Sequence, residues 1–219
     1  PHVEVRGQLA ATAKRLSVGH ALPIIRELLG HDADASDIYQ PLMVWWALES
    51  KVAAHPNAVL GLFDDESLWQ TSLVREHVLS RLMRRFTKAG TRSDLLASAR
   101  LFEMAPNVES AKILMAGFEQ SYKGRSMAAL PERLLAAMEG HGGGSLALDL
   151  RRGEAKAIDE ALRVIADVKA DKVMRLQYTE ILGEVPSAKA IPVFLGIVKS
   201  EPGSDLKRAA LGSLKPYND

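Results

Sequence analysis

Residues 175–183 read Arg-Leu-Gln-Tyr-Thr-Glu-Ile-Leu-Gly, residues 190–195 read Ala-Ile-Pro-Val-Phe-Leu, and residues 206–214 read Leu-Lys-Arg-Ala-Ala-Leu-Gly-Ser-Leu. Leu182-Gly183 returns as Leu211-Gly212 after a step of 29 residues. Self-similarity at such a step is typical of helical repeats, in which each helix pair buries its apolar face only against the next pair. These segments therefore predict an α-solenoid.

The same helical spacing of apolar residues continues toward the N-terminus. Ile158, Ala161, Leu162, Ile165 and Val168 form one helical stripe, and no run of the chain alternates with the period of a strand. We therefore expect an all-α protein, an α-α superhelix of about five helix pairs without a β-sheet. The expected helices lie near residues 3–17, 20–30, 37–54, 57–64, 67–89, 92–104, 108–122, 130–139, 145–151, 154–169, 171–183, 188–199 and 204–214.

Residue types at the helix ends agree with these ranges. Ser67, Ser93, Ser126 and Ser204 stand at expected N-caps. The expected C-caps are Gly30, Gly90, Gly140 and Gly183.

The composition excludes several kinds of chemistry from this chain. Its 219 residues contain no cysteine, so disulfides, thiolate metal sites and cysteine nucleophiles are ruled out. The 28 Lys and Arg residues nearly balance the 27 Asp and Glu residues, and the net charge is +1. Binding to nucleic acid would therefore need a local basic patch rather than a global charge excess.

The repeat pattern resembles HEAT repeats, in which a first helix carries an Ile-Pro or Leu-Pro step and a second ends in Ala-Leu-Gly-x-Leu. Ala190-Ile191-Pro192 and Ala210-Leu211-Gly212-Ser213-Leu214 carry this resemblance at one end, and Ala21-Leu22-Pro23 carries it at the other. The resemblance implies an armadillo-like helical array that binds other proteins.

A narrower resemblance extends over nearly the whole chain. It rests on Tyr39-Gln40-Pro41-Leu42-Met43-Val44-Trp45-Trp46-Ala47-Leu48-Glu49, Leu73-Val74-Arg75-Glu76, Arg81-Leu82-Met83-Arg84-Arg85-Phe86, Lys123-Gly124-Arg125-Ser126 and Ser145-Leu146-Ala147-Leu148. These segments are similar to the helical-repeat region of large planctomycete-type membrane-bound dehydrogenases, also described as haem-binding CxxCH proteins. The resemblance implies a dehydrogenase domain before the repeats, a haem c domain after them, and an extracytoplasmic location. It implies no cofactor in this segment, which lacks the CxxCH motif.

We expect residues 1–219 to form a single helical-repeat domain. The chain begins at Pro1 without Met, which predicts a segment of a longer multidomain protein. His141-Gly142-Gly143-Gly144 predicts a break in the array near residues 140–145 rather than an esterase oxyanion hole, because no nucleophile elbow accompanies it. The longest apolar run, Leu42 to Leu48, has seven residues, whereas a membrane span needs about 20, so no membrane insertion is expected.

The three tryptophans are candidates for a binding surface. Trp45 and Trp46 lie in a stretch that is apolar on every side of its helix, which favours core packing. Because adjacent helical residues point about 100° apart, at most one of the two is expected to reach a surface groove. Trp69 is expected near that groove.

The basic residues Arg81, Arg84, Arg85 and Lys88 form one stripe on a predicted helix. Upstream, residues 27–66 contain eight acidic residues and one base, Lys51. The stripe has three open interpretations: a solvated face that pairs with acids of a neighbouring repeat, a docking site for an acidic partner domain, or a nucleic-acid site. With Trp69 it forms our candidate interaction surface.

No catalytic, metal or cofactor site is predicted. His31, Asp32, Asp34 and Asp37 depart from the calcium-loop pattern, which requires a glycine where Asp37 stands. We therefore expect a non-catalytic scaffold or docking module whose partners are proteins or flanking domains. The alternative is a HEAT-like DNA-binding protein or DNA glycosylase with Trp and Arg residues in a concave groove. Neither hypothesis fixes the oligomeric state.

Overall fold

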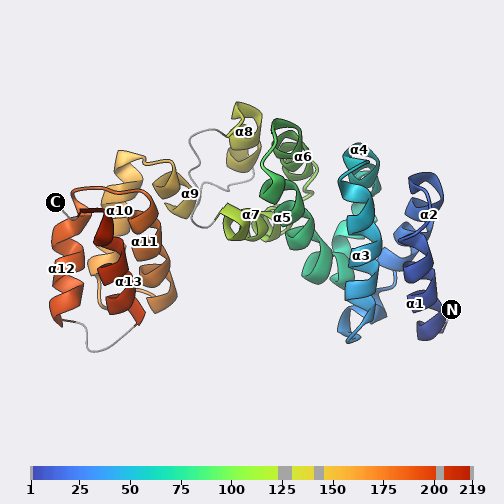
Figure 1. The fold of residues 1–219 in the computed structure, drawn as a ribbon, viewed down its shortest axis with the longest axis horizontal. Coiled ribbons are helices and arrows are strands. Elements are labelled where there is room, and N and C mark those ends of the chain that lie inside the picture. Colours follow the sequence, from blue (N-terminus) through green and yellow to red (C-terminus); the bar gives the residue numbers. More distant parts are fainter. Residues whose placement is uncertain (1, 123–129, 141–145, 201–204, 218–219) are drawn as a thin grey trace. The chain divides into compact units, whose positions relative to one another are not determined.

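A computed structural model describes residues 2–122, 130–140, 146–200 and 205–217, and it is all-helical over these ranges (Figure 1). No strand occurs among these residues, as the sequence predicts. Contacts between the helices divide the chain into two compact units, one with helices α1 to α8 and the other with α9 to α13. The single domain expected over residues 1–219 stays a prediction, and residues 141–145 of the expected break lie outside the described ranges.

The first unit contains eight α-helices among its described residues. They are α1 (Val3–Ala13), α2 (Val18–Leu29), α3 (Gln40–Val52), α4 (Pro56–Leu60), α5 (Leu79–Ala89), α6 (Arg92–Glu103), α7 (Val108–Tyr122) and α8 (Glu132–Gly140). Short 3₁₀ segments lie between them at Asp32–Ser36, Gly61–Asp64 and Glu66–Gln70. One π-helical turn, Val74–Val78, leads directly into α5, so the long helix expected over 67–89 is divided into three segments.

The second unit contains five α-helices and a 3₁₀ turn at Lys215–Tyr217 in its described part. Its core is formed by buried side chains that include Ile165, Tyr178, Leu182 and Phe194. The α-helices are α9 (Leu146–Arg151), α10 (Ala155–Ala166), α11 (Lys172–Glu184), α12 (Ala190–Ser200) and α13 (Asp205–Ser213).

Helix ends are set by polar side chains, although not always by those that the sequence indicates. Thr91, rather than Ser93, caps α6 by accepting a hydrogen bond from the Asp94 amide. The 3₁₀ segment Glu66–Gln70 is capped by Asp65 rather than by Ser67. Gly90 ends α5 in the left-handed conformation at φ 67°, as expected of a glycine C-cap.

Gly183 does not end a helix. It lies inside α11, and a Cβ built at this position would be 2.9 Å from Cβ of Ser213 on α13. Its lack of a side chain therefore permits two helices to approach closely, which corrects the expected C-cap. Ser126 and Ser204 lie outside the described residues.

Helices α1 and α3 run parallel, with α2 packed against both (Figure 1). At their N-terminal ends, Nε2 of Gln40 donates to the carbonyl of Val3 at 2.8 Å. At their C-terminal ends, Nζ of Lys51 donates to the carbonyls of Lys14 and Leu16, each at 2.8 Å. Both ends of the α1–α3 contact are therefore fixed by side chains of α3.

Candidate functional site

A hollow of about 480 Å³ lies beside α5 in the first unit. Arg81, Arg84, Arg85 and Lys88 of the predicted stripe all line it, so the structure brings these four residues together. We call this hollow the basic groove. Its other lining residues are Trp45 and Glu49 from α3 and Gln120 and Ser121 from α7.

The amphipathic pattern of α5 explains why the basic side chains gather there. Leu82, Met83 and Phe86 are buried on one face of this helix, which fixes its rotation about its own axis. The stripe occupies a different face because it follows i, i+3, i+4, i+7 spacing with its own offset. The hydrophobic core thus directs the basic side chains into the groove.

The four basic residues differ in their partners. The guanidinium of Arg81 donates to the main-chain carbonyl of His77 at 2.5 Å, one turn earlier. Arg85 lies 3.7 Å from Glu49, so one member of the stripe pairs with an acid from another helix. Arg84 is exposed and has no ion pair within the described part of the chain. The described lining of the groove contains four basic residues and one acidic residue, Glu49.

The acidic stretch of residues 27–66 is mostly occupied elsewhere in the first unit. Asp34 is buried and accepts from Nε of Arg6 at 2.7 Å, and Asp65 pairs with Arg26. Asp32 accepts hydrogen bonds from the amide and hydroxyl of Ser72. Of the acids in this stretch, Glu49 is the one among the described lining residues of the basic groove. The other acids of the stretch therefore do not neutralise the basic stripe.

Asp37 stabilises the start of α3, the helix that carries Trp45 and Glu49. Its carboxylate accepts from the amides of Tyr39 at 2.8 Å and Gln40 at 2.9 Å. The hydrogen bond from Gln40, followed by that from Tyr39, holds the pKa of Asp37 below its usual value. The acids near His31 thus serve in capping and ion pairing, and no group of three potential metal ligands occurs among the described residues.

Trp69 does not belong to this surface. It is 1% exposed, its indole N–H donates to the carbonyl of Phe63 at 2.9 Å, and its ring packs edge-on against the Phe63 ring at 5.6 Å between centroids. The expectation that Trp69 contributes to an interaction surface is wrong, because the turns between α4 and α5 enclose this side chain.

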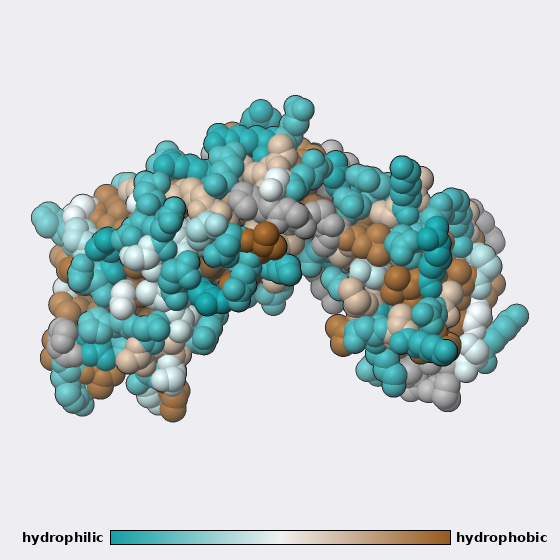
Figure 2. All heavy atoms as spheres, turned by 180° about the vertical axis from the view of Figure 1, so that it is seen from behind, coloured by the Kyte–Doolittle hydropathy of each residue, from teal (hydrophilic) through white to brown (hydrophobic). Residues whose placement is uncertain are grey.

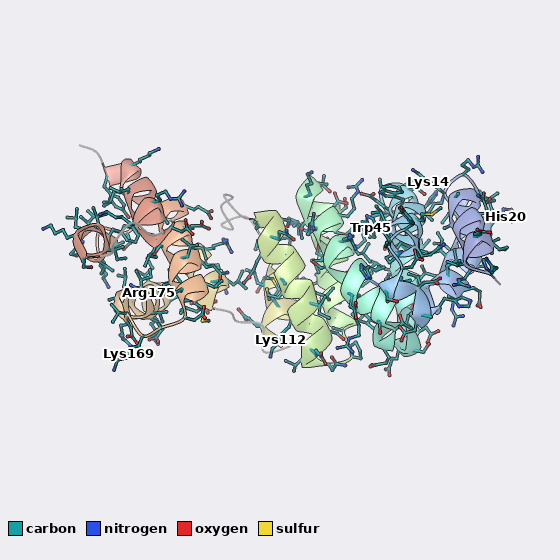
Figure 3. The ribbon with its side chains drawn as sticks, turned by 90° about the horizontal axis from the view of Figure 1, so that it is seen from below. Lys14, His20, Trp45, Lys112, Lys169 and Arg175 are labelled. Atoms are coloured by element: carbon teal, nitrogen blue, oxygen red, sulfur yellow. The ribbon has the colours of Figure 1, made fainter. Side chains whose placement is uncertain are left out.

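The paired tryptophans of α3 face different surroundings. Trp45, labelled in Figure 3, is 6% exposed and lines the wall of the basic groove. Trp46 is 46% exposed and lies below the Lys14 ammonium, which is 5.7 Å from the centroid of its ring. Each of the two lines a groove, so the expectation that at most one of them reaches a surface groove is wrong. Adjacent helical positions point about 100° apart, which directs the two side chains toward different grooves, and of the pair Trp46 is the exposed residue.

The described lining of the basic groove is rich in positively charged groups. Three guanidinium groups and one ammonium group can bind an anion, and Gln120 and Ser121 add hydrogen-bonding groups at the rim. His141 to Gly144 and Lys123 to Ser126 lie outside the described residues.

In the view of Figure 2 the molecular surface is largely hydrophilic, and hydrophobic residues are scattered over it in small groups.

Within the described ranges, no helix has both the length and the apolar character that crossing a bilayer demands.

Comparison with known proteins identifies no relative. No family model matches the chain, and no curated protein and no solved structure matches it significantly.

Proposed function

We propose that this chain is a non-catalytic docking module whose basic groove binds an acidic segment of a partner protein or of a neighbouring domain in the same polypeptide. The observation that carries this proposal is the convergence of Arg81, Arg84, Arg85 and Lys88 on one hollow that contains a single acidic residue, Glu49, among its described lining residues.

Arginine suits this role because its planar guanidinium binds carboxylates through two parallel hydrogen bonds. The basic side chains at the rim are solvent-accessible, so salt screens their attraction for a partner. We therefore expect fast, salt-sensitive association of moderate affinity, in which the groove selects for negative charge.

We further propose that the helices stack as HEAT-like pairs in an α-solenoid. One feature in each unit supports this proposal. Helices α1 and α3 are parallel neighbours, as equivalent helices of successive pairs are, and α11 contacts both α9 and α13 in the second unit. Applied to the whole chain, this proposal is a continuous solenoid of about five helix pairs.

The resemblance to planctomycete-type dehydrogenase proteins suggests where the acidic partner originates. In such a protein, the dehydrogenase domain and the haem c domain are separate from the repeats, and the proposed module connects them. The basic groove would then receive an acidic loop of one of these domains. No cofactor is assigned to the segment itself.

A second candidate function is DNA binding, including DNA glycosylase activity. The position of Trp45 in the groove wall favours it, because an aromatic side chain beside Arg residues can stack on a base. The burial of Trp69, the low exposure of Trp45 and the presence of Glu49 in the groove count against it.

The test is fluorescence anisotropy with a labelled deca-glutamate peptide and with a DNA oligonucleotide of equal net charge, at low salt and at about 0.15 M salt. We expect Arg84→Glu/Lys88→Glu to weaken peptide binding at least about tenfold, as for two lost charged contacts. The control Arg92→Glu/Lys112→Glu changes the net charge equally at exposed positions outside the groove and should retain binding.

Equal losses in both double variants would show non-specific attraction and contradict the docking proposal. Tighter binding of the oligonucleotide than of the peptide, lost only in the groove variant, would favour the DNA-binding alternative. Circular dichroism of each variant verifies that the helices remain folded.

A further inference from the structure

A second and larger groove, of about 870 Å³, lies between α1 and α3 in the first unit. Its α3 side is lined by Tyr39, Leu42, Met43 and Trp46, which makes it predominantly apolar. We call it the apolar groove. It is distinct from the basic groove because Trp46 faces it, whereas the adjacent Trp45 faces the other.

Three large apolar side chains of this groove remain accessible to solvent. Tyr39 is 71% exposed, Trp46 46% and Leu42 39%. Single exposed apolar residues are ordinary, but a cluster that lines one hollow indicates a binding surface. Tryptophan, tyrosine and methionine are also enriched at protein interfaces.

The walls of the apolar groove are fixed before any partner binds. Gln40 ties the N-terminal ends of α1 and α3 together, and Lys51 ties their C-terminal ends. An ion pair between the half-buried Arg6 and the buried Asp34 connects α1 to the 3₁₀ segment that precedes α3. A groove whose walls are already ordered loses little conformational entropy on binding.

The register of α3 sets the length of the occupant. Tyr39, Leu42, Met43, Trp46 and Ser50 follow i, i+3, i+4, i+7, i+11 spacing and line one side of the groove. At 1.5 Å per residue they extend over roughly 16 Å, which is about three turns of a helix. An amphipathic helix of about this length fits an apolar groove between two helices.

The charged residues at the rim of the apolar groove favour a partner of negative charge. Lys14 and Arg15 are exposed, and they are the charged residues among the described residues that line this groove. No acid faces them there, so the complementary partner carries Asp or Glu beside its apolar face. A second copy of this chain is a poor occupant, because two apolar grooves facing each other would bring their basic rims together.

We propose that the apolar groove binds an acidic amphipathic helix of a partner protein, with its apolar side chains against Leu42 and Trp46 and its carboxylates against Lys14 and Arg15. This site goes beyond the basic groove, and either proposal can fail without the other, since the two grooves have no lining residue in common among those that the structure describes.

The test selects a library of displayed 16-residue peptides against the intact chain, after depletion on the Trp46→Ser variant. We expect the selected peptides to combine apolar residues at helical spacing with Asp or Glu, and to become helical on binding. Synthetic copies should bind at least about tenfold more weakly to Trp46→Ser and to Lys14→Glu/Arg15→Glu, as for the loss of an interface anchor.

The second variant changes only exposed side chains, since Lys14 contributes its main-chain carbonyl to the contact with Lys51. Arg84→Glu/Lys88→Glu, in the basic groove, is the matched control and should retain peptide binding. The proposal is overturned if no selected peptide depends on Trp46, if the selected peptides lack acidic residues, or if they bind without becoming helical. A dimer in light scattering that Trp46→Ser dissociates would assign the groove to a second copy and also overturn it.

Discussion

Trp45 and Trp46 are neighbours in sequence, yet their side chains have different environments. Trp45 is enclosed beside the basic groove, whereas Trp46 forms part of the exposed lining of the apolar groove. This difference follows from the rotation of about 100° between consecutive residues of a helix. Two adjacent residues of one helix can therefore differ widely in the exposure of their side chains.

Quenching of tryptophan fluorescence by acrylamide tests this assignment. Trp46 is the accessible one of the three tryptophans, so Trp46→Phe should remove most of the quenchable emission. Trp69→Phe is the control and should leave the quenchable fraction nearly unchanged, because Trp69 is enclosed. A quenchable fraction that persists in Trp46→Phe would contradict the burial of Trp45 and Trp69.

Gly117 of α7 allows this helix to approach α5 closely. A Cβ at this position would lie 2.5 Å from the carbonyl oxygen of Ser80 and 3.0 Å from its Cα, and main-chain atoms cannot rotate away. We expect Gly117→Ala to lower the free energy of unfolding by about 1–3 kcal/mol, as overpacking does. Thermal unfolding should show a melting temperature that is lower by several degrees.

The matched control is Gly19→Ala in α2, where a new Cβ would meet no atom within 4 Å. Because alanine favours helices over glycine, this variant should be as stable as the parent or slightly more stable. If the two variants melt at the same temperature, the close contact between α5 and α7 is not as described.

At the scale of the helix, Lys51 determines how α1 and α3 pack together. Its side chain is buried, and its ammonium donates to the carbonyl of Lys14, the C-cap of α1, and to that of Leu16 just beyond this helix. Lys14 also lines the apolar groove, so this contact helps to fix a wall of that groove. A basic residue inside the acidic stretch thus has a structural role in the packing of two helices.

We expect Lys51→Met to retain the apolar stem but to remove the ammonium hydrogen bonds to the carbonyls of Lys14 and Leu16. Loss of such partners costs about 1–3 kcal/mol, measurable by urea unfolding. Lys112→Met, at an exposed position of α7 that is labelled in Figure 3, is the control and should change the stability little. Similar unfolding midpoints for both variants would contradict a role of Lys51 in capping α1.

At the scale of the whole molecule, several carboxylates make the stability depend on pH. Hydrogen bonds from the hydroxyl and then the amide of Ser67 lower the pKa of Asp65, and the hydrogen bond from Arg133 lowers the pKa of Glu103. Hydrogen bonds from the main-chain amides of Gln40 and Tyr39 lower the pKa of Asp37 as well. A carboxylate with a lowered pKa in the folded state contributes stability above its unfolded pKa, and this contribution is lost as the pH falls through the folded value.

The unfolded values lie near 4, so the urea midpoint should be steady above about pH 5 and fall below about pH 4. Asp65→Asn should show a smaller loss between neutral and acidic pH, because it carries no proton-binding group at this position. If the urea midpoint of Asp65→Asn falls as steeply at acidic pH as that of the parent, the Asp65 carboxylate is not coupled to folding.

The proposed solenoid has its own test in solution. A compact globule of this length has a radius of gyration of about 17 Å, and a continuous array of helix pairs should give a clearly larger value in small-angle X-ray scattering. A measured value near that of a compact globule would count against the continuous array.

Helical periodicity predicted most of the helices but not the details of their ends. The stripe of Ile158, Ala161, Leu162 and Ile165 packs into the core of the second unit, whereas its expected last member, Val168, is exposed beyond the end of α10. The predicted long helix over 67–89 contains 3₁₀ and π segments. Such segments depend on packing against neighbouring helices, which local sequence spacing does not encode.

The sequence by itself determined that the chain is helical and that Arg81, Arg84, Arg85 and Lys88 share a helix face, because both follow from the 3.6-residue period. Only the tertiary structure decided that Trp69 is buried, that Trp46 is exposed, and that Tyr39 to Trp46 and α1 form an apolar groove. The physical reason is that burial and grooves arise from contacts between helices. Those contacts depend on close approaches, such as that of Gly117 to Ser80, and on polar pairs between residues distant in sequence, such as Arg6 and Asp34.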